Sequence, residues 1–487
     1  MIARRACLGF AAMAWPVAAD PIFEPVAVPE HVYSGGWEHF VGGGVAVFDC
    51  DGDALPEIVA AGGATPVTLL RNRDGMVFER GDMPEITGAT GVYALDLDAD
   101  GALDLVVTRV GPNTVLRGDG ACGFVPDDMG LPMGEAWTTA FSATWAGDRP
   151  TLAFGNYVDR DDPEGPFEAC DDNSVVRPVA GGWEEIVLSP GFCALSILFS
   201  DEDRDGVPTL RLSNDRHYYV RGGAEQMWSL AEARFLGLED GFVGPSIWGM
   251  GIASRDITGD ARPDLVLTSM GDQLTMLSTE TGHEMAPFEI GSFAQRPHVG
   301  EDGRPSTGWH AEWGDVDNDG DADLFIAKGN VDQMPGMAMA DPNNLLLNEG
   351  GVFREVSEGA GVASMHRGRG GALADLDLDG RLDLVVVNRR APLEVWRNLS
   401  EAGNAVSVRL VQSGGNRDAV GAWVEVRTGA GVQLQELNLG GGHGGDAVAP
   451  LHFGIGSADT AEVRVTWPDG EVGESVPVVV GQVTIRR

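Results

Sequence analysis

Acidic residues recur along this chain at alternate positions, and side chains with that spacing can surround a metal ion. The repeated pattern is Asp-x-Asp-x-Asp-x-x-x-acid, with an apolar run on each side of it. Because alternate side chains of a tight loop converge, positions one, three, five and nine would supply carboxylate oxygens and position seven a backbone carbonyl. Calcium accepts about six to eight oxygen ligands. The pattern therefore predicts calcium-binding loops.

Four copies of the pattern are complete, and two are weaker. The predicted ligands of the complete copies are Asp49, Asp51, Asp53, Leu55 and Glu57; Asp96, Asp98, Asp100, Ala102 and Asp104; Asp315, Asp317, Asp319, Asp321 and Asp323; and Asp375, Asp377, Asp379, Arg381 and Asp383. Those of the weaker copies are Asp201, Asp203 and Asp205, with Thr209 at position nine, and Asp256, Asp260 and Asp264, with Thr258 at position three. We expect about four to six calcium ions. The alternative, acidic decoration for solubility, does not explain the fixed spacing.

The spacing of the copies indicates the elements that position them. The copies begin at residues 49, 96, 201, 256, 315 and 375, and the interval after 96 is about twice the others. A hidden copy at residues 143–154 fills that gap but lacks the acids, so we expect no calcium there. Repeats of this length with several short strands are typical of propeller blades. The sequence therefore predicts an all-β fold, with a seven-bladed β-propeller at 20–400 and a small C-terminal β-domain at 401–487.

The two ends of the propeller sequence fit together. The last repeat runs out after residues 393–398 with only three apolar runs. Residues 23–26 resemble 353–356, which form the expected fourth strand of the preceding repeat. We expect the N-terminal strand to complete the last blade and close the ring, because closure removes open sheet edges.

The charge of the chain argues against two classes of partner. There are 33 Lys and Arg against 74 Asp and Glu, which gives a formal net charge of −41. Nucleic acids and acidic membrane surfaces would be repelled by this excess of negative charge. We therefore expect a protein or a surface carbohydrate as partner, and no nucleic acid.

The N-terminus and the cysteines indicate an oxidising compartment. Residues 1–19 combine Arg4 and Arg5 with a short apolar run that ends in small residues, which predicts a signal peptide cleaved after Ala19; a buried N-terminal helix is the alternative. No other run is long and apolar enough to span a bilayer, so we expect a secreted protein, periplasmic or extracellular, without a transmembrane segment. Cys170 and Cys193 are expected to pair, which leaves Cys50 and Cys122 as partners by elimination. Four free buried thiols are the alternative.

The repeats and the tail together resemble known families. The acidic repeats resemble the FG-GAP, or VCBS, repeats of integrin α-chain propellers and of many secreted bacterial proteins. Residues 416–422, 440–443, 451–456 and 465–470 resemble the ASPIC/UnbV domain. This resemblance implies calcium binding, secretion and a role in binding or adhesion, without a defined reaction.

The chain shows no pattern that predicts catalysis. None of its nine histidines stands in a zinc-binding spacing, and no nucleophile or phosphate-loop signature is present. The Gly-rich segment 440–446, which contains His443, could bind an anion through its amides, but a structural loop is the simpler interpretation. Trp248, Trp309, His310 and Trp313 precede two of the acidic loops and would either line a central channel or pack between blades.

Three functions remain open from the sequence. We favour a calcium-stabilised module that binds or scaffolds a protein or a surface polymer, and we expect no enzymatic activity. The alternative is a propeller that binds or cleaves carbohydrate, which would need acid–base residues to converge in one cleft. A purely structural surface or matrix component is the third.

Overall fold

The computed structural model describes residues 20–487 except 163–168, 216–222, 281, 301 and 333. The expected signal peptide therefore lies outside the described residues. The described part is built almost entirely of β-strands, and its one α-helix is the short α1 (Ser357–Ala360). This composition confirms the predicted all-β class. No helix of the described part has the length and apolar character that a membrane crossing requires.

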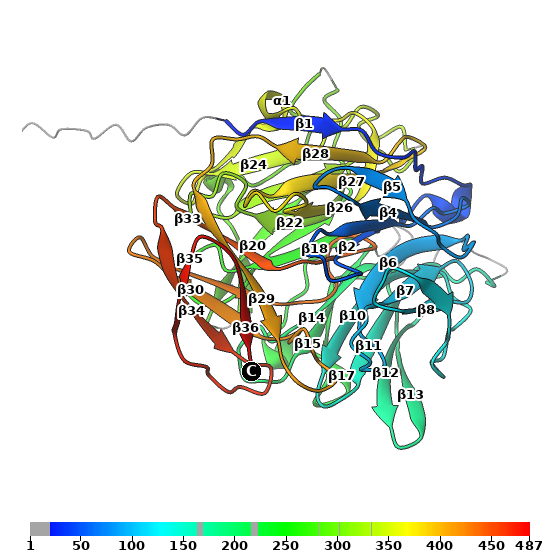
Figure 1. The fold of residues 1–487 in the computed structure, drawn as a ribbon. Helices are drawn as coiled ribbons and strands as arrows, with labels where there is room; N and C mark the ends of the chain where they lie inside the picture. The colour runs from blue at the N-terminus through cyan, green and yellow to red at the C-terminus, as the bar shows by residue number, and fades with distance from the viewer. Residues whose placement is uncertain (1–19, 163–168, 216–222, 281, 301, 333) are drawn as a thin grey trace, which may run out of the picture.

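Seven antiparallel sheets follow one another along the chain and form the blades of a β-propeller (Figure 1). In chain order they are β2 (Val45–Phe48) to β5 (Phe78–Arg80), β6 (Ala89–Leu95) to β9 (Phe124–Pro126), β10 (Thr138–Trp145) to β13 (Gly182–Leu188), β14 (Ala194–Ser200) to β17 (Arg234–Phe235), β18 (Gly249–Arg255) to β21 (Gly282–Met285), β22 (Gly308–Gly314) to β25 (Phe353–Glu355), and β26 (Arg367–Ala374) to β28 (Glu394–Asn398) with β1 (Phe23–Val26). We number them blades 1 to 7. The first strand of each blade contacts that of the next, and β26 contacts β2, so the ring is closed.

The N-terminal strand completes the last blade, as the sequence predicts. β1 pairs antiparallel with β28, with Phe23 opposite Asn398 and Val26 opposite Val395. Phe23 is buried against Val316 and Trp396 in the core between blades 6 and 7. Figure 1 shows β1 along the outer side of β28. The ring is therefore closed by strands from both ends of the propeller sequence.

Residues 404–486 form two further sheets. One contains β33 (Leu451–Gly456), β29 (Asn404–Val411) and β36 (Gly481–Arg486), and the other contains β31 (Val432–Glu436), β30 (Trp423–Arg427), β34 (Thr460–Thr466) and β35 (Val476–Val479). Apolar side chains of both sheets, including Val406, Val424 and Phe453, share one core. β35 and β36 are neighbours in the sequence but belong to different sheets, because the backbone turns at Gly481, where φ is +105°.

A loop between β31 and β33 fills the centre of the propeller. Its amides at Gly441 and Gly442 donate hydrogen bonds to the carbonyls of Ile197 (2.8 Å) and Ile252 (2.7 Å), on the first strands of blades 4 and 5. On the other side of the ring, β32 (Ala447–Val448) pairs in parallel with β2. Because the loop bonds to the innermost strands of several blades, it lies in the central channel. We call residues 439–448 the plug.

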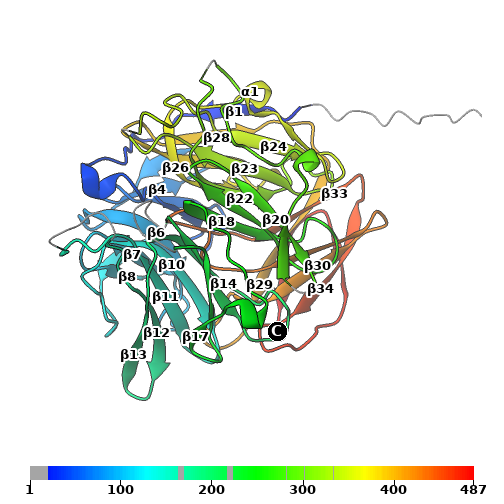
Figure 2. The same cartoon turned by 180° about the vertical axis from the view of Figure 1, so that it is seen from behind.

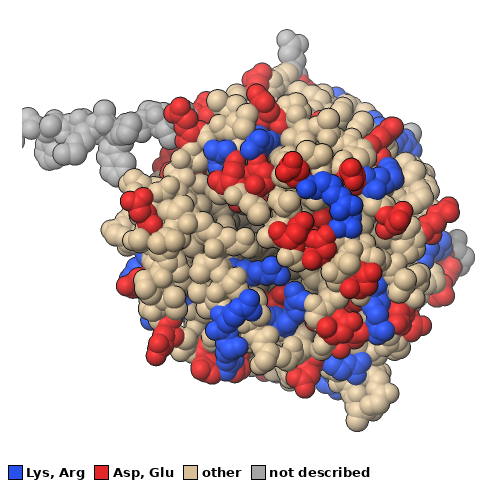
Figure 3. All heavy atoms as spheres, in the orientation of Figure 1, with Lys and Arg blue, Asp and Glu red and all other residues tan. Residues whose placement is uncertain are grey.

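Charged side chains are spread widely over the molecule. On the face drawn in Figure 3, acidic residues lie across the surface with Lys and Arg between them. Figure 2 shows the opposite side, where the strands of blades 4 to 6 lie in front. The acidic loops thus hold only part of the negative charge, and the remainder is dispersed.

Candidate metal centres

Each acidic loop connects the first strand of its blade to the second. Asp315, for example, follows β22, and Asp323 is the first residue of β23 (Asp323–Lys328). We name the loops after their blades: loops 1, 2, 4, 5, 6 and 7 cover residues 49–57, 96–104, 201–209, 256–264, 315–323 and 375–383. Because both ends of every loop are held by a strand pair, the first and ninth positions are fixed relative to each other.

All six loops share one backbone conformation. The fourth and the sixth residue of each loop have positive φ, among them Gly52 (82°) and Ala54 (78°) in loop 1, and Asn318 (57°) and Gly320 (108°) in loop 6. Glycine adopts a left-handed backbone conformation without strain, and Asn tolerates it better than most other residues. Gly at position six is therefore explained. The left-handed fourth position, filled by Ala99 in loop 2, was not foreseen from the sequence.

The first aspartate of every loop organises the turn around it. Its carboxylate accepts a hydrogen bond from the amide of the sixth residue in all six loops: Ala54 to Asp49 (3.1 Å), Gly101 to Asp96 (3.0 Å), Gly206 to Asp201 (2.9 Å), Ala261 to Asp256 (2.9 Å), Gly320 to Asp315 (2.8 Å) and Gly380 to Asp375 (2.9 Å). These bonds leave the remaining lone pairs of the same oxygens free to bind a cation. The first position thus serves both the fold of the loop and its ligand geometry.

The ninth carboxylate is buried in every loop that has one. Asp323 accepts hydrogen bonds from the amides of Val316 and Asn348, each at 2.8 Å, and Asp383 does the same with Leu376 and Asn398. Glu57, Asp104, Asp264 and Asp383 have no exposed surface. In loop 4, where Thr209 replaces this acid, the hydroxyl is 3.5 Å from the carbonyl oxygen of Ser200. In loops 6 and 7 the ninth carboxylate is therefore held by its own loop and by the third strand of the blade.

The fold brings the predicted ligands together in at least four of the loops. Carboxylate oxygens lie within 4.8 Å of one another in Asp49, Asp51 and Asp53; in Asp96, Asp98 and Asp104; in Asp201, Asp203 and Asp205; and in Asp315, Asp317 and Asp323. In loop 5, the Asp260 carboxylate instead accepts from the Ser278 hydroxyl at 3.1 Å. In loop 6, the Asp321 carboxylate accepts from the amide of Gly350 at 3.1 Å, whereas the atom that the pattern predicts as a ligand is its backbone carbonyl.

In three loops, an arginine on the third strand of the blade forms an ion pair with the carboxylate at loop position three. Arg71 is paired with Asp51, Arg117 with Asp98 at 2.6 Å, and Arg397 with Asp377. These arginines were not predicted from the sequence, although each is the fourth residue of its strand. Loop 6 has Leu347 at that place, on β24 (Asn344–Asn348). In loop 6, no arginine on the third strand pairs with the carboxylate at position three, Asp317.

Burial raises the pKa of the loop carboxyls. It raises the pKa of Glu57 to about 7 and that of Asp104 to about 6. In loop 6, burial together with the neighbouring acids raises the pKa of Asp315 and Asp323 well above the usual range. The nearby Arg255 lowers the pKa of Asp315, but by less than burial raises it. Among the described residues, Asp317 Oδ1 and Asp96 Oδ1 accept no hydrogen bond although both atoms are buried. These loops therefore hold more negative charge than the surrounding protein compensates, and a divalent cation would compensate it.

The hidden copy in blade 3 is a hinge of the same kind without ligands. β10 and β11 (Pro150–Asn156) pair in register from Trp145 opposite Pro150, so only residues 146–149 connect them. Four connecting residues are too few for the nine-residue pattern of the other loops, and the absence of calcium at this hinge stays a prediction.

Both expected disulfides are present in the described residues. Cys170 is joined to Cys193, and Cys50 to Cys122. Cys50 is the second residue of loop 1, whereas Cys122 lies in the turn before β9 of blade 2. The second disulfide therefore ties loop 1 to the neighbouring blade.

The histidine in the plug is engaged in structural contacts. His443 Nδ1 donates to the carbonyl of Met250, and its Nε2 accepts from the amide of Gly42, each at 3.1 Å. Burial lowers its pKa to about 3, so the ring is neutral. The amides of Gly441 and Gly442 are already bonded to blades 4 and 5. These contacts favour the structural interpretation of the Gly-rich loop over anion binding.

The aromatic residues before the acidic loops take different roles. Trp309 stacks edge-on against His443, with ring centroids 4.9 Å apart, and His310 Nδ1 accepts from the amide of His443 at 3.1 Å. Trp313 packs against Phe353 within the core between blades 5 and 6. Packing around the plug and between blades therefore accounts for these three residues, and no open channel is needed to explain them.

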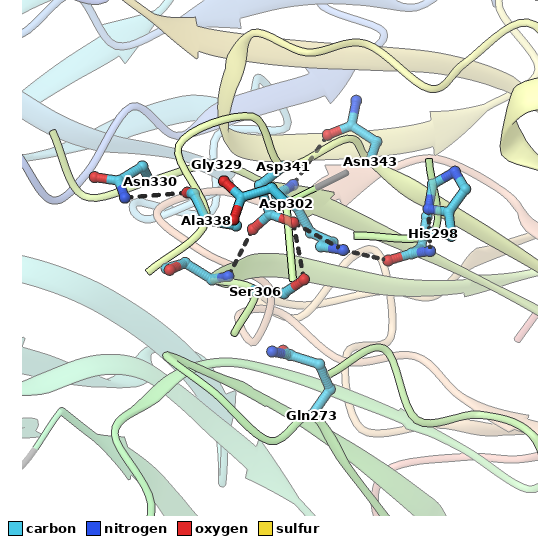
Figure 4. Close-up of polar contacts among 12 residues, drawn as sticks. Gln273, His298, Asp302, Ser306, Gly329, Asn330, Ala338, Asp341 and Asn343 are labelled. Carbon is cyan, nitrogen blue, oxygen red and sulfur yellow. Dashed lines mark hydrogen bonds and ion pairs between the residues drawn. The ribbon is translucent and has the colours of Figure 1, made fainter. Parts of the chain in front are cut away.

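A second polar cluster lies in blade 6 (Figure 4). Lys328 and Asp341, both without exposed side-chain surface, form an ion pair of 3.0 Å. Ser306 donates to Asp341 at 2.8 Å, and Lys328 donates to Asn344 at 2.8 Å. Because its charges are paired and enclosed, the cluster joins the segment before β22 to β23 and β24 and offers no reactive group to solvent.

Two protein families match separate parts of the chain. The FG-GAP-like repeat family matches residues 49–107, which contain loops 1 and 2. The ASPIC and UnbV family matches residues 412–486, which include the plug. The resemblance inferred from the sequence is confirmed at both places.

Known proteins resemble the chain over much of its length. Cartilage acidic protein 1 of Mus musculus is 25% identical, and the match covers 88% of this chain and 71% of that protein. Its counterpart in Homo sapiens is 27% identical over 47% of this chain and 34% of its own length. Solved structures of similar fold include YCF48 from Cyanidioschyzon merolae (10% identity, TM-score 0.44, 77% of this chain and 99% of that chain) and an Agrocybe aegerita lectin (14% identity, TM-score 0.41, 74% and 94%). The chain is thus a homologue of cartilage acidic protein 1 that carries an FG-GAP-like repeat and an ASPIC and UnbV segment.

Proposed function

We propose that this protein is a secreted calcium-binding propeller that binds or scaffolds another protein or a surface polymer, and that it is not an enzyme. An FG-GAP repeat propeller suggests a protein-binding module. The two disulfides are consistent with an oxidising compartment outside the cytoplasm, periplasmic or extracellular.

The geometry of loop 6 carries the calcium proposal. Asp315, Asp317 and Asp323 direct carboxylate oxygens to within 4.8 Å of one another, and all three residues are buried. The Asp317 Oδ1 atom accepts no hydrogen bond within the described part of the chain. A buried, unpaired carboxylate oxygen is costly, and a bound cation would remove that cost.

The ligand set favours calcium over magnesium. It combines several carboxylates with a backbone carbonyl in a flexible loop, whereas magnesium demands near-ideal octahedral geometry and usually keeps several waters. Extracellular calcium modules have dissociation constants of roughly 10⁻⁴ to 10⁻³ M. Affinity in that range is sufficient here, because the ion's role in this proposal is to stabilise the blade loops.

The histidines support a binding role over a catalytic one. His31, His310, His443 and His452 are buried and engaged in hydrogen bonds. Burial lowers the pKa of His31 to about 4, and that of His452 to about 3. The side chains of His31, His443 and His452 are therefore neutral and enclosed, unlike the general acid–base groups that a carbohydrate-cleaving propeller would need.

Calcium binding by variants tests the proposal. Protein stripped with chelator would be titrated with calcium by isothermal calorimetry, with magnesium as the ion control. Asp317→Asn should remove about one equivalent of bound calcium, because it takes a charge from the most buried loop. Asp148→Asn, in the ligand-free hinge of blade 3, is the matched control and should bind as the wild type does. Wild-type protein that binds no calcium at millimolar concentration would overturn the proposal.

A further inference from the structure

The contact between blades 4 and 5 differs from the others in the ring. Most neighbouring blades share a large apolar core, such as the one between blades 1 and 2 that includes Phe48, Leu69 and Leu105. The corresponding buried cluster between blades 4 and 5 consists of Leu198, Ile252, Leu265 and Leu267. The outer parts of these two blades stand apart, and a cavity of about 510 Å³ lies between them. We call it the blade 4–5 cleft.

One substitution in the repeat explains the opening. Two residues beyond the ninth loop position, the second strand of a blade directs a side chain toward the next blade, as Val106 and Phe325 do in blades 2 and 6. Blade 4 has Arg211 at this position, on β15 (Thr209–Asn214). A guanidinium cannot join an apolar core without a partner. The blades therefore separate where the arginine stands.

Arg211 is satisfied within the wall of the cleft. Its Nε and Nη2 donate to the two carboxylate oxygens of Glu202 at 3.0 and 3.1 Å, and its side chain is only 5% exposed. Its guanidinium carbon lies 5.7 Å from the centre of the Phe242 ring. Glu202 neutralises the charge of Arg211, so the arginine is not free to bind an anion.

The free surface of the cleft is apolar inside and acidic at the rim. Met227, Leu236 and Met276 line it, and Val243 stands at its edge with 70% of its surface exposed. Glu280 and Glu284 are exposed lining residues outside the calcium loops, and no ion pair within the described residues neutralises them. Arg262 also lines the cleft; it donates to the carbonyl of Thr279 at 2.8 Å and has no ion pair among the described residues. Two unpaired carboxylates thus stand against one guanidinium, and the net unpaired charge of the lining is negative.

We propose that the blade 4–5 cleft binds an extended segment of a partner protein in which Lys or Arg stands among apolar side chains. The cavity has the size of ordinary ligand pockets, which measure about 300–1,000 Å³. Apolar side chains of the segment would occupy the interior, while its long cationic side chains reach the acidic rim. The inference rests on the proposed binding function, and it assigns that function a surface and a class of partner.

The same lining disfavours a saccharide in this place. Hydroxyl-rich ligands need free polar partners, but Glu202 and Arg211 are bonded to each other, and Ser278 is bonded to Asp260. Recruiting them for a sugar would break bonds that are already made. The exposed carboxylates of Glu280 and Glu284 at the rim attract cations.

The experiment uses the full mature chain and an array of 12-residue peptides in which Lys or Arg alternates with Leu, Phe or Met. The matched array has Glu and Asp in place of the cations, and maltotriose is the saccharide probe. We expect binding to the cationic array alone. The double variant Glu280→Lys/Glu284→Lys should weaken the best peptide at least tenfold, because attraction becomes repulsion at the rim. Glu85→Lys/Glu474→Lys, at exposed acids in blade 1 and the C-terminal sheets, has the same net charge and should change binding less than threefold.

A third variant separates apolar contact from charge. Val243→Ser leaves the charge unchanged and, because Val243 is exposed, should not disturb the fold; we expect about threefold weaker binding. Unfolding midpoints verify that every variant is folded. Equal binding to both arrays, binding of maltotriose alone, no binding at all, or equal effects of the two charge pairs would each overturn the proposal.

Calcium binding is measured on the same samples. Normal calcium binding without peptide binding overturns the cleft alone, whereas peptide binding without calcium binding overturns the calcium proposal alone.

Discussion

The plug allows the most demanding test of the fold. Gly44 precedes β2 and lies directly against the plug: a Cβ at this position would be 1.6 Å from the carbonyl oxygen and 2.1 Å from the carbonyl carbon of Gly444. Both are backbone atoms, so no side-chain rotation can relieve the contact. We therefore expect Gly44→Ala to displace the plug from blade 1.

The cost follows from the contacts that the displacement would break. The amide of Val92 donates to Gly444 at 2.9 Å, and that of Val47 donates to Asp446 at 3.2 Å. Each hydrogen bond contributes about 1 kcal/mol, and overpacking costs about 1–3 kcal/mol more. The free energy of unfolding should thus fall by about 3–5 kcal/mol.

Urea unfolding followed by tryptophan fluorescence measures this change, because the plug packs against Trp309. Gly429→Ala is the matched control, since a Cβ there meets no atom within 4 Å, and it should shift stability by no more than about 0.5 kcal/mol. A Gly44→Ala protein within 1 kcal/mol of the wild type would refute the close approach of the plug to blade 1.

Three further predictions concern ring closure, the disulfide and the plug histidine. Phe23→Ala should lower the free energy of unfolding by about 3–5 kcal/mol in a denaturant titration, because Phe23 is buried between blades 6 and 7, whereas Ile22→Ala, at a residue 53% exposed, should cost little; equal effects would contradict closure by β1. Replacing Cys50 and Cys122 together with Ser should cost about 4 kcal/mol by the loop-entropy relation for a separation of 72 residues, and unchanged thermal stability would show that the disulfide restrains nothing. The folded pKa of His443, about 3, lies below its ordinary 6.5, so its contribution is complete above pH 6.5 and is lost as the pH falls toward 3. The stability advantage of the wild type over His443→Gln should therefore shrink by about 1.4 kcal/mol per pH unit between pH 6 and pH 4, and a constant difference would contradict the neutral, buried ring.

The features that sequence reasoning found are those that repeat. The acidic pattern located six hinge loops, and its irregular interval located a seventh hinge at residues 146–149 without acids. The missing fourth strand of the last repeat identified Phe23–Val26 as its completion. In each case the same local pattern forms the same structure in every blade, so each copy strengthens the prediction for the others.

The features that were missed depend on contacts between distant segments. The plug binds through glycine backbones to strands some 190 to 400 residues earlier, and backbone contacts of that kind leave no periodic side-chain pattern. The split of residues 476–485 between two sheets turns on the backbone at Gly481 alone. Arg211 did have a signal, because it stands where the five other blades with an acidic loop carry Val or Phe, but its meaning required knowing which face of the strand meets the next blade.

The central claim, that the acidic loops bind calcium and thereby stabilise the propeller, is tested most directly by thermal unfolding of residues 20–487. The protein would be unfolded in excess chelator and then across a calcium titration, with magnesium as control. At a calcium concentration one hundred times the dissociation constant, each occupied site adds about 2.7 kcal/mol, so several sites should raise the melting temperature by many degrees and do so specifically for calcium. An unchanged melting temperature, together with no calcium retained by the purified protein, would contradict the account.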